Sequence, residues 1–266
     1  MSNFAEWKGK WALVTGASSG IGVALARELA AAGVNLILTA RRVERLQAVA
    51  AELGAGFGVE VRVLPADLNQ RAAAAELFAA TEGAGLPVDI LINNAGLGQY
   101  GRFLDGKLEQ ELSMVEVNCT SVVHLTRLFV PKMVERKRGW VLVLASTASY
   151  QPVPYMATYA ASKAFDRFFA EGLAAEVERY GVHVTALCPG PTESEFFLVA
   201  GSREMDRSMK RQSVVEVARI GLEALYGGRR AVIPYLGGRL MTFLQRALPR
   251  KTVVQQAEKM FRPPTV

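Results

Sequence analysis

Seven short apolar segments, separated from one another by helical patterns, constrain the fold of this chain most strongly. They begin near residues 11, 34, 59, 89, 140, 182 and 230. Strands read as nearly continuous apolar runs when helices cover both faces of a parallel sheet. Alternation of strands and helices favours that arrangement over a sandwich or a helical bundle. We therefore predict an α/β fold with a doubly wound, mainly parallel sheet of seven strands.

The composition is that of one compact domain. Hydrophobic residues make up 50% of the 266 residues, which is enough for a substantial core. The chain has no internal repeat, and the small-residue stretch 54–58 predicts a loop rather than a domain boundary. We assign residues 1–235 to the main domain and residues 236–266 to a basic, amphipathic C-terminal extension packed on it.

A glycine-rich turn follows the first predicted strand, residues 11–15. Glycines at such a turn let the backbone approach a pyrophosphate, and the next helix offers free N–H groups and the positive end of its dipole. The spacing Gly-x-x-x-Gly-x-Gly differs from the general dinucleotide fingerprint, so a purely structural turn is the alternative. The candidate phosphate-binding residues are Gly16, Ser18, Ser19, Gly20, Ile21 and Gly22.

The second predicted strand ends at Ala40, and Arg41 and Arg42 follow it. An NAD-binding unit would place an acidic residue here, against the ribose 2′-hydroxyl. Guanidinium groups suit a 2′-phosphate instead, because arginine is permanently charged and offers a planar fork of donors. The alternative is that both arginines are solvated residues at the start of the next helix. The glycine turn and the arginines together favour NADP(H) as the cofactor.

Tyr159 and Lys163 lie four residues apart in a helical pattern, so their side chains share one face. An ammonium group beside a phenol favours the phenolate and lowers the pKa of the phenol. Ser146 follows the apolar run 141–145, where its hydroxyl could hold a carbonyl oxygen. This set suits carbonyl reduction or alcohol oxidation. The alternative is a surface lysine beside a half-buried tyrosine.

In order and spacing, these motifs resemble the short-chain dehydrogenase/reductase family. The resemblance covers about residues 8–235 and includes Asn118 and the segments 93–96 and 189–190. It implies a Rossmann fold and an oxidoreductase. Family members are often dimers or tetramers, so the resemblance also implies a homodimer or homotetramer.

The resemblance assigns a role to each catalytic candidate. Tyr159 would be the general acid/base, and Lys163 would lower its pKa and bind the nicotinamide ribose. Ser146 would hold the substrate oxygen. Asn118 would anchor a water that links Lys163 to solvent, or be an ordinary satisfied polar group.

Three further segments match the family's cofactor contacts. Asp67 and Leu68 would contact the adenine, although Asp67 could be an ordinary cap. Asn94, Ala95 and Gly96 would lie beneath the adenine ribose. The segment that would wrap the nicotinamide comprises Pro189, Gly190, Thr192 and Ser194. Ser194 stands where the family usually has threonine. Thr192 and Glu195 could also form a capping box for the next helix.

Two apolar stretches predict the substrate. Residues 195–200, with 203–211 and 214–218 after them, would form one wall of the ligand crevice. A second wall would come from Tyr150, Val153, Pro154, Tyr155 and Met156. We predict a medium-sized hydrophobic ketone, aldehyde or secondary alcohol, with the helix around Phe196 as a mobile lid. The alternative is that Phe196 and Phe197 only anchor that helix in the core.

The net charge of +6 comes from the end of the chain. Residues 229–262 hold eight basic side chains and one acidic one, against 23 basic and 24 acidic in the rest. This distribution, without a recognition motif, argues against a nucleic-acid partner. The tail carries an apolar stripe at helical spacing, formed by Leu236, Leu240, Phe243, Leu244 and Ala247. This stripe predicts core packing with snorkelling arginines. A substrate lid, a subunit contact and a membrane-surface contact are the alternatives.

The predicted function is an NADP(H)-dependent oxidoreductase that interconverts a hydrophobic ketone or aldehyde and its alcohol. A redox-sensing or regulatory protein that binds NADP without turnover is the alternative. Two cysteines and two histidines predict neither a metal site nor a disulfide framework. Residues 1–10 lack an apolar signal core, so we expect a cytoplasmic protein.

Overall fold

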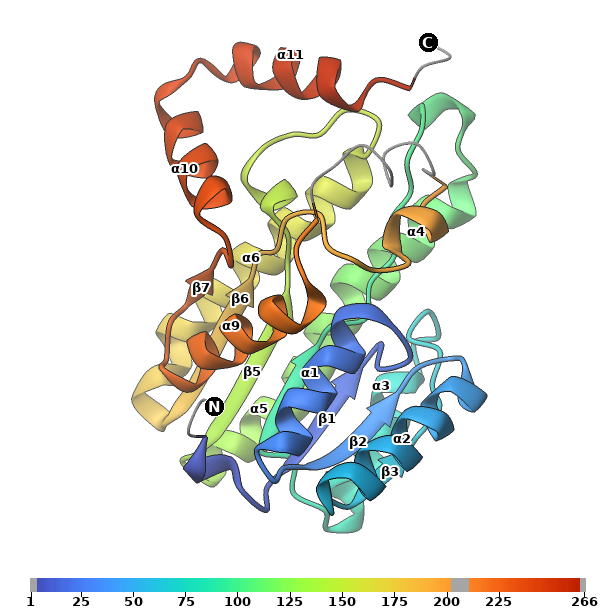
Figure 1. Cartoon of the computed structure of the whole chain (residues 1–266), viewed down its shortest axis with the longest axis vertical. Helices are drawn as coiled ribbons and strands as arrows, with labels where there is room; N and C mark the ends of the chain where they lie inside the picture. The colour runs from blue at the N-terminus through green and yellow to red at the C-terminus, as the bar shows by residue number, and fades with distance from the viewer. Residues whose placement is uncertain (1–3, 202–210, 264–266) are drawn as a thin grey trace.

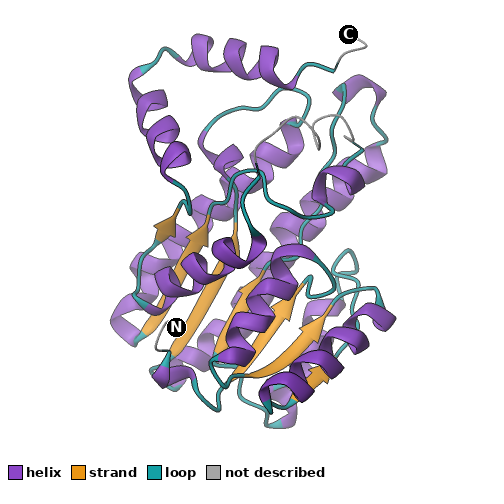
Figure 2. Ribbon diagram, in the orientation of Figure 1, coloured by secondary structure: helices purple, strands orange, loops and turns teal. Residues whose placement is uncertain are grey.

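A single parallel sheet forms the centre of the protein (Figures 1 and 2). The computed structural model describes residues 4–201 and 211–263. Within them the strands lie in the order β3-β2-β1-β4-β5-β6-β7, with every neighbouring pair parallel. The strands are β1 (Trp11–Thr15), β2 (Asn35–Thr39), β3 (Val61–Val63), β4 (Ile90–Asn93), β5 (Gly139–Leu144), β6 (Val182–Leu187) and β7 (Ala231–Val232). The predicted seven-stranded, doubly wound fold is confirmed.

Helices cover both faces of the sheet (Figure 1). Successive strand residues point to opposite faces, so Val14 joins one hydrophobic core and Leu13 the other. The first core lies under α1 (Gly20–Ala31), α2 (Val43–Phe57) and α9 (Val214–Tyr226). The second lies under α3 (Ala73–Ala79), α5 (Ser121–Glu135) and α6 (Ala157–Val177).

The remaining helical elements lie near the carboxyl ends of the strands or in short connections. Helix α4 (Leu108–Val115) continues through a π-helical turn, Glu116–Thr120, into α5. Helix α7 (Phe196–Val199) is a single turn. Short 3₁₀ turns occur at Ala5–Trp7, Glu82–Ala84, Phe103–Asp105, Thr147–Tyr150, Glu178–Tyr180 and Gln245–Ala247.

Helix α2 extends through the stretch 54–58 that the sequence predicts as a loop. Gly54 and Gly56 are helical, and the helix ends only at Gly58, which has a left-handed φ of 66° and donates its N–H to the Gly54 carbonyl. Leu53 is fully buried in the first core. Packing of this turn therefore outweighs the entropic cost of glycine in a helix. The loop prediction was wrong for all but the final glycine.

Helices α10 (Leu236–Leu244) and α11 (Arg250–Phe261) form an arch over the carboxyl ends of the strands (Figure 1). We call residues 236–262 the C-terminal arch. Its predicted apolar stripe is not in the core, since Leu236 is 79% exposed and Phe243 is 67% exposed. Helix α10 meets the domain through Gly238, whose Cα lies so close to Tyr235 that a Cβ would be 2.5 Å from its ring. This close approach of a small residue turns the large side chains outward, so the core-packing prediction for the stripe was wrong.

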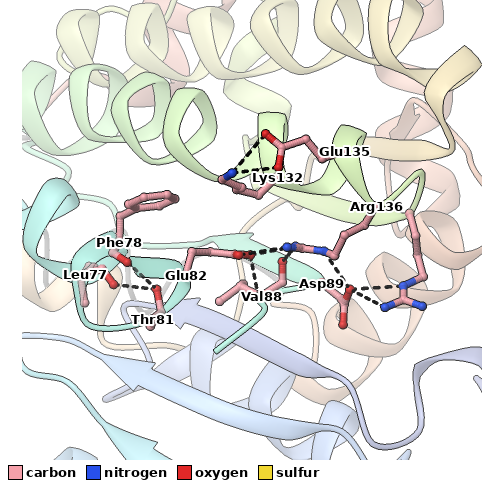
Figure 3. A network of polar contacts seen from close by, with 10 residues as sticks. Leu77, Phe78, Thr81, Glu82, Val88, Asp89, Lys132, Glu135 and Arg136 are labelled. Carbon is pink, nitrogen blue, oxygen red and sulfur yellow. Dashed lines mark hydrogen bonds and ion pairs between the residues drawn. The ribbon is translucent and has the colours of Figure 1, made fainter. Parts of the chain in front are cut away.

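A partly buried polar network lies at the amino end of β4 (Figure 3). Arg136, at the end of α5, donates to Glu82 at 2.7 Å and to the Val88 carbonyl at 3.0 Å. Asp89 Oδ1 lies 3.7 Å from Arg136 Nε and 3.2 Å from Arg138 Nη2. The network fixes the end of α5 against the sheet at the amino ends of the strands, opposite their carboxyl ends.

No helix in the described part of the chain is long and apolar enough to cross a membrane. The same residues contain no group of three or more His, Cys, Asp or Glu side chains that could hold a metal ion. Cys119 and Cys188 are free thiols.

Candidate active site

A cavity of about 640 Å³ lies at the carboxyl ends of the strands, beneath the C-terminal arch. Ser146 lines it, whereas Asn118 is fully buried behind it. Every residue of the predicted cofactor set lines the cavity: Gly16, Ser18, Ser19, Gly20, Ile21, Gly22, Arg41, Arg42, Asp67, Leu68, Asn94, Ala95, Gly96, Tyr159, Lys163, Pro189, Gly190, Thr192 and Ser194.

The glycine turn between β1 and α1 is held by hydrogen bonds to the end of β4. The Thr15 hydroxyl donates to the Ile92 carbonyl and accepts the N–H groups of Asn94 and Ala95, each at 2.9 Å. The Asn94 amide donates back to the Thr15 carbonyl at 2.8 Å. These bonds join the two strands at the topological switch point, where doubly wound sheets bind ligands.

The glycines of this turn leave room that any side chain would fill. A Cβ on Gly22 would collide with the Gly16 carbonyl oxygen, and Gly16 itself has a left-handed φ of 65°. The turn opens directly into α1, whose first N–H groups are available to an anion. This open backbone at a helix N-terminus fits the pyrophosphate of a dinucleotide.

Arg41 and Arg42 have different surroundings. Arg41 is exposed at the cavity and has no hydrogen-bond partner among the described residues. Arg42 donates to the hydroxyls of Ser18 and Ser19, at 3.1 and 2.7 Å, and to Glu195 at 2.9 Å. Arg42 therefore braces the glycine turn, while Arg41 is free to meet a phosphate.

Glu195 joins the segment before α7 to the start of α2. Its carboxylate accepts from Arg42 and from Arg45, both at 2.9 Å. These hydrogen bonds, the one from Arg42 above all, lower the pKa of Glu195. The Thr192 hydroxyl donates to the Gly190 carbonyl instead of capping a helix. The predicted capping box from Thr192 to Glu195 does not form, because the arginines take its carboxylate.

Tyr159 and Ser146 face each other at the floor of the cavity. Ser146 follows β5, accepts the Ala148 N–H at 3.1 Å and keeps its hydroxyl beside Pro189. Burial raises the pKa of Tyr159, while the Lys163 charge and hydrogen bonding with Ser146 lower it. The phenol thus holds its proton at neutral pH, beside two groups that stabilise the phenolate once the proton has left.

Lys163 is buried one turn further along α6. Its Nζ donates to the Leu144 carbonyl at 2.7 Å and to Asp166 Oδ2 at 2.9 Å. An ammonium group has three donors, so these two bonds leave one for a further acceptor at the cavity wall, such as a ribose hydroxyl. No sequence motif pointed to Asp166, although its spacing of three residues from Lys163 on a helix is a signal that could have found it.

Asn118 lies in the π-helical turn before α5. Its amide accepts the Leu97 N–H at 2.8 Å and donates to the Leu97 carbonyl and the Ser162 hydroxyl, both at 2.9 Å. A Cβ on Gly96 would be 3.4 Å from both Asn118 Oδ1 and Lys163 Nζ. Asn118 thus ties the loop after β4 to α6 next to Lys163. The predicted water relay stays a prediction.

The predicted substrate walls are found in part. Val153, Met156, Phe196 and Val199 line the cavity, and residues 203–210 of the first wall lie outside the described residues. The centroid of the Phe196 ring lies 5.0 Å from that of Tyr159, so Phe196 packs against Tyr159 rather than only anchoring its own helix. Tyr150, Pro154 and Tyr155 of the second wall do not line the cavity, and neither do Leu198, Ala200, Arg211 and residues 214–218 of the first wall.

The C-terminal arch supplies cavity residues that the sequence did not indicate. Met241, Met260 and Phe261 line the cavity, together with Tyr235 just before α10. The Tyr155 hydroxyl donates to Glu258 at 2.8 Å and so tethers α11 above the second wall. The helical spacing of the tail predicts its helices, and the position of Met241, Met260 and Phe261 agrees with a substrate lid, one of the alternatives to core packing.

Comparison with known proteins shows which family this chain is similar to. The model of the family described as "short chain dehydrogenase" matches residues 10–206. A very-long-chain 3-oxoacyl-CoA reductase of Anas platyrhynchos is 38% identical over 189 residues, which are 68% of this chain and 59% of that protein. The first four curated relatives are matched over only 53% to 59% of their own length.

Two solved structures share the whole architecture. A short-chain dehydrogenase of Sphingobium yanoikuyae in complex with NADPH has a TM-score of 0.82 and 31% identity, covering 90% of this chain and 93% of that one. A 7β-hydroxysteroid dehydrogenase has a TM-score of 0.86 and 28% identity, covering 96% of this chain and 99% of that one.

Proposed function

This chain belongs to the short-chain dehydrogenase family, and on that premise we propose that it is an NADP(H)-dependent reductase of hydrophobic ketones or aldehydes. Membership of the family makes it an oxidoreductase that acts on a carbonyl or alcohol group. The observation that carries the proposal is that Ser146, Tyr159 and Lys163 lie at the floor of a cavity whose other walls fit a dinucleotide and an apolar ligand.

In the proposed reaction the protein positions the carbonyl oxygen and supplies a proton. The bound cofactor would supply the hydride to the carbonyl carbon. Ser146 donates a hydrogen bond to the carbonyl oxygen, and Tyr159 delivers its phenolic proton to the same atom as charge develops there. Lys163 stabilises the resulting phenolate by its charge. In the oxidative direction the phenolate of Tyr159 takes the proton from the alcohol.

Preference for NADP(H) is supported by the end of β2. Ala40 stands where an acidic residue would bind a ribose 2′-hydroxyl, and Arg41 is exposed there without a partner among the described residues. A charged hydrogen bond of about 1.5 to 3 kcal/mol corresponds to roughly ten- to a hundredfold discrimination. Arg41→Ala combined with Ala40→Asp should invert the ratio of kcat/KM for NADPH and NADH. Equal efficiency of the wild-type protein with both cofactors would overturn this preference.

The substrate class is supported by the lining of the cavity. Beyond Tyr159 its walls are apolar and sulfur-containing side chains from the loop before α6 and from helices α7, α10 and α11, which match a bulky, apolar molecule better than a sugar. Two relatives have names that point the same way, a very-long-chain 3-oxoacyl-CoA reductase and a 7β-hydroxysteroid dehydrogenase, whereas another structural neighbour is named as an L-sorbose reductase. A 3-oxoacyl thioester with a long chain is therefore the first compound to test. The wall residues are Val153, Met156, Phe196, Val199, Met241, Met260 and Phe261.

Oxidation of NADPH in the presence of a carbonyl panel tests this function. The panel pairs long-chain 3-oxoacyl thioesters, cyclic ketones and steroid ketones with keto sugars and small keto acids. We expect the highest kcat/KM among the apolar compounds. Higher efficiency on the polar compounds would contradict the proposed substrate. Binding of NADPH without turnover of any compound would favour a regulatory protein instead.

The proposed assembly is a homodimer or homotetramer, as in many members of the family. Exposed apolar side chains on α4, α5 and α6 support it, among them Leu112 at 59% and Phe168 at 62% exposure. Analytical ultracentrifugation of the full chain tests the assembly, and a monomer at micromolar concentration would contradict it. A cytoplasmic location stays a prediction.

A further inference from the structure

Lys163 and Asp166 form an ion pair in the interior of the protein. They lie one turn apart on α6, their nearest atoms are 2.9 Å apart, and their side chains are 4% and 1% exposed. Lys163 has a role in the proposed reaction, but Asp166 does not line the cavity and has none so far. The proposed function thus leaves a buried charge unexplained.

Asp166 is not well placed to serve stability. A buried ion pair is often no more stable than apolar residues of similar volume, because both charges lose their hydration. Asp166 Oδ1 has no hydrogen-bond partner among the described residues, so Lys163 is the only group that satisfies this carboxylate there. Its neighbours along α6, Ala170 and Ala174, are buried and apolar. A leucine would suit these surroundings better, so a functional reason for the carboxylate is needed.

The surroundings show which group depends on Asp166. Burial alone would lower the pKa of Lys163, but the Asp166 carboxylate opposes this, and the pKa of Lys163 lies above its ordinary value. The other titratable groups that face the pair are Tyr159, on the same helix, and Cys119, in the π-helical turn. Burial raises the pKa of Cys119 to about 11, so this thiol stays neutral. Burial raises the pKa of Asp166, while the charge of Lys163 and its hydrogen bond oppose the rise, and Asp166 is the carboxylate that contacts the ammonium.

We propose that Asp166 is a positioning residue for the reaction, which holds the Lys163 ammonium charged and fixed beside Tyr159. This inference rests on the proposed function. The ion pair and the bond to the Leu144 carbonyl orient two of the three N–H groups of Lys163. The third is then directed by tetrahedral geometry rather than free to rotate.

Asp166 acts on Tyr159 in two opposite ways. Its own negative charge raises the pKa of Tyr159, whereas the Lys163 charge, which it maintains, lowers that pKa by more. Loss of the carboxylate should therefore remove the larger, favourable effect. If Lys163 instead kept its charge without Asp166, the pKa of Tyr159 would fall. The sign of the shift distinguishes the two cases.

The test is Asp166→Asn in the full-length protein, read by the near-ultraviolet absorption of tyrosinate. The titration of Tyr159 is obtained by subtracting the curve of Tyr159→Phe made in the same background, so it requires no known substrate. We expect the midpoint to move alkaline by about one pH unit, a tenfold change in ionisation constant. The pH profile of kcat for alcohol oxidation should move the same way, because that direction needs the phenolate. If Asp166→Asn does not fold, Asp166→Ser, which keeps an acceptor for Lys163, takes its place.

Asp89→Asn is the matched control. Asp89 is also a buried carboxylate in an ion pair, but it lies at the amino end of β4 (Figure 3). It should lower stability and leave the Tyr159 midpoint unchanged. An unchanged or acid-shifted midpoint in a folded Asp166→Asn variant would overturn the proposal. Because the absorption titration needs no turnover, failure of the proposed function would appear separately, as the absence of activity in the wild-type protein.

Discussion

The two ends of the cavity are built by different means. At the nucleotide end, the loops after β1 and β4 are held by hydrogen bonds between the side chains of Thr15 and Asn94 and backbone groups of the facing loop. At the arch end, apolar side chains from α10 and α11 line the cavity. The side-chain hydrogen bonds that join the described part of the arch to the domain are few: Tyr155 with Glu258, Gln245 with Gln151, and Arg239 with the Ile233 carbonyl. The backbone of the nucleotide end is thus fixed by several hydrogen bonds, whereas the arch is joined to the domain mainly by apolar packing. This contrast suggests that cofactor binding tolerates few changes and substrate choice tolerates many.

Tyr159→Phe should have the largest effect, because Tyr159 lies where the two ends meet. The ring and its packing against Phe196 remain, but the proton donor is lost. We expect turnover to fall by about 10² to 10⁴, as for other general acids, with little change in NADPH affinity. Steady-state kinetics and fluorescence titration of NADPH measure the two quantities. Tyr180→Phe, at an exposed position, is the control. More than about a tenth of wild-type turnover would exclude Tyr159 as the acid.

A glycine-to-alanine substitution at each end of the cavity should show that the nucleotide end tolerates an added methyl group less well than the arch does. In Gly22→Ala the new Cβ collides with a backbone carbonyl of the glycine turn, so we expect a loss of about 1 to 3 kcal/mol in stability and weaker NADPH binding. In Gly237→Ala, on the arch, the nearest atom is Tyr235 Cδ2 at 3.6 Å, an ordinary contact. Here stability should rise by up to about 1 kcal/mol, since glycine is unfavourable in a helix. Chemical denaturation measures both, and equal losses would abolish the contrast.

The smallest effect is expected at the outer face of the arch. Phe243 is 67% exposed, so Phe243→Gln should change the free energy of unfolding by no more than about 0.5 kcal/mol. Phe129→Ala, at a fully buried residue of α5, should cost about 3 to 5 kcal/mol and calibrates the measurement. A large loss at Phe243 would mean that the stripe is covered in solution. Size-exclusion chromatography of both proteins would then identify a second copy as the cover.

The sequence predicted that the residues of the nucleotide end lie together, because the constraints on them are local. A glycine that must approach a phosphate, and an arginine in place of an acid, are visible within a few residues of a strand. The strands were equally readable, since burial on both faces makes each a continuous apolar run. All predicted cofactor residues accordingly line one cavity.

The arch could not be predicted in the same way, because periodicity shows which residues share a face but not what that face meets. Leu240 and Phe243 form a regular stripe, yet the small face at Gly238 packs on the domain. The capping box failed for a related reason, as Glu195 is bound by arginines about 150 residues away in sequence. Asp166 was missed because its spacing of three residues from Lys163 shows that the two share a helix face, but not that the pair is buried.

The cavity is lined by residues from both ends of the chain, such as Gly16 and Phe261, so it is complete only when the whole chain has folded. Contacts so far apart in sequence form late in folding, because long loops must close before any such contact is made. A dinucleotide that binds only the completed cavity stabilises the fully folded protein. At a free dinucleotide concentration of a hundred times Kd, it adds about 2.7 kcal/mol to the free energy of unfolding. Cellular cofactor supply would thereby set how many chains persist in the native state, as well as how fast each one works.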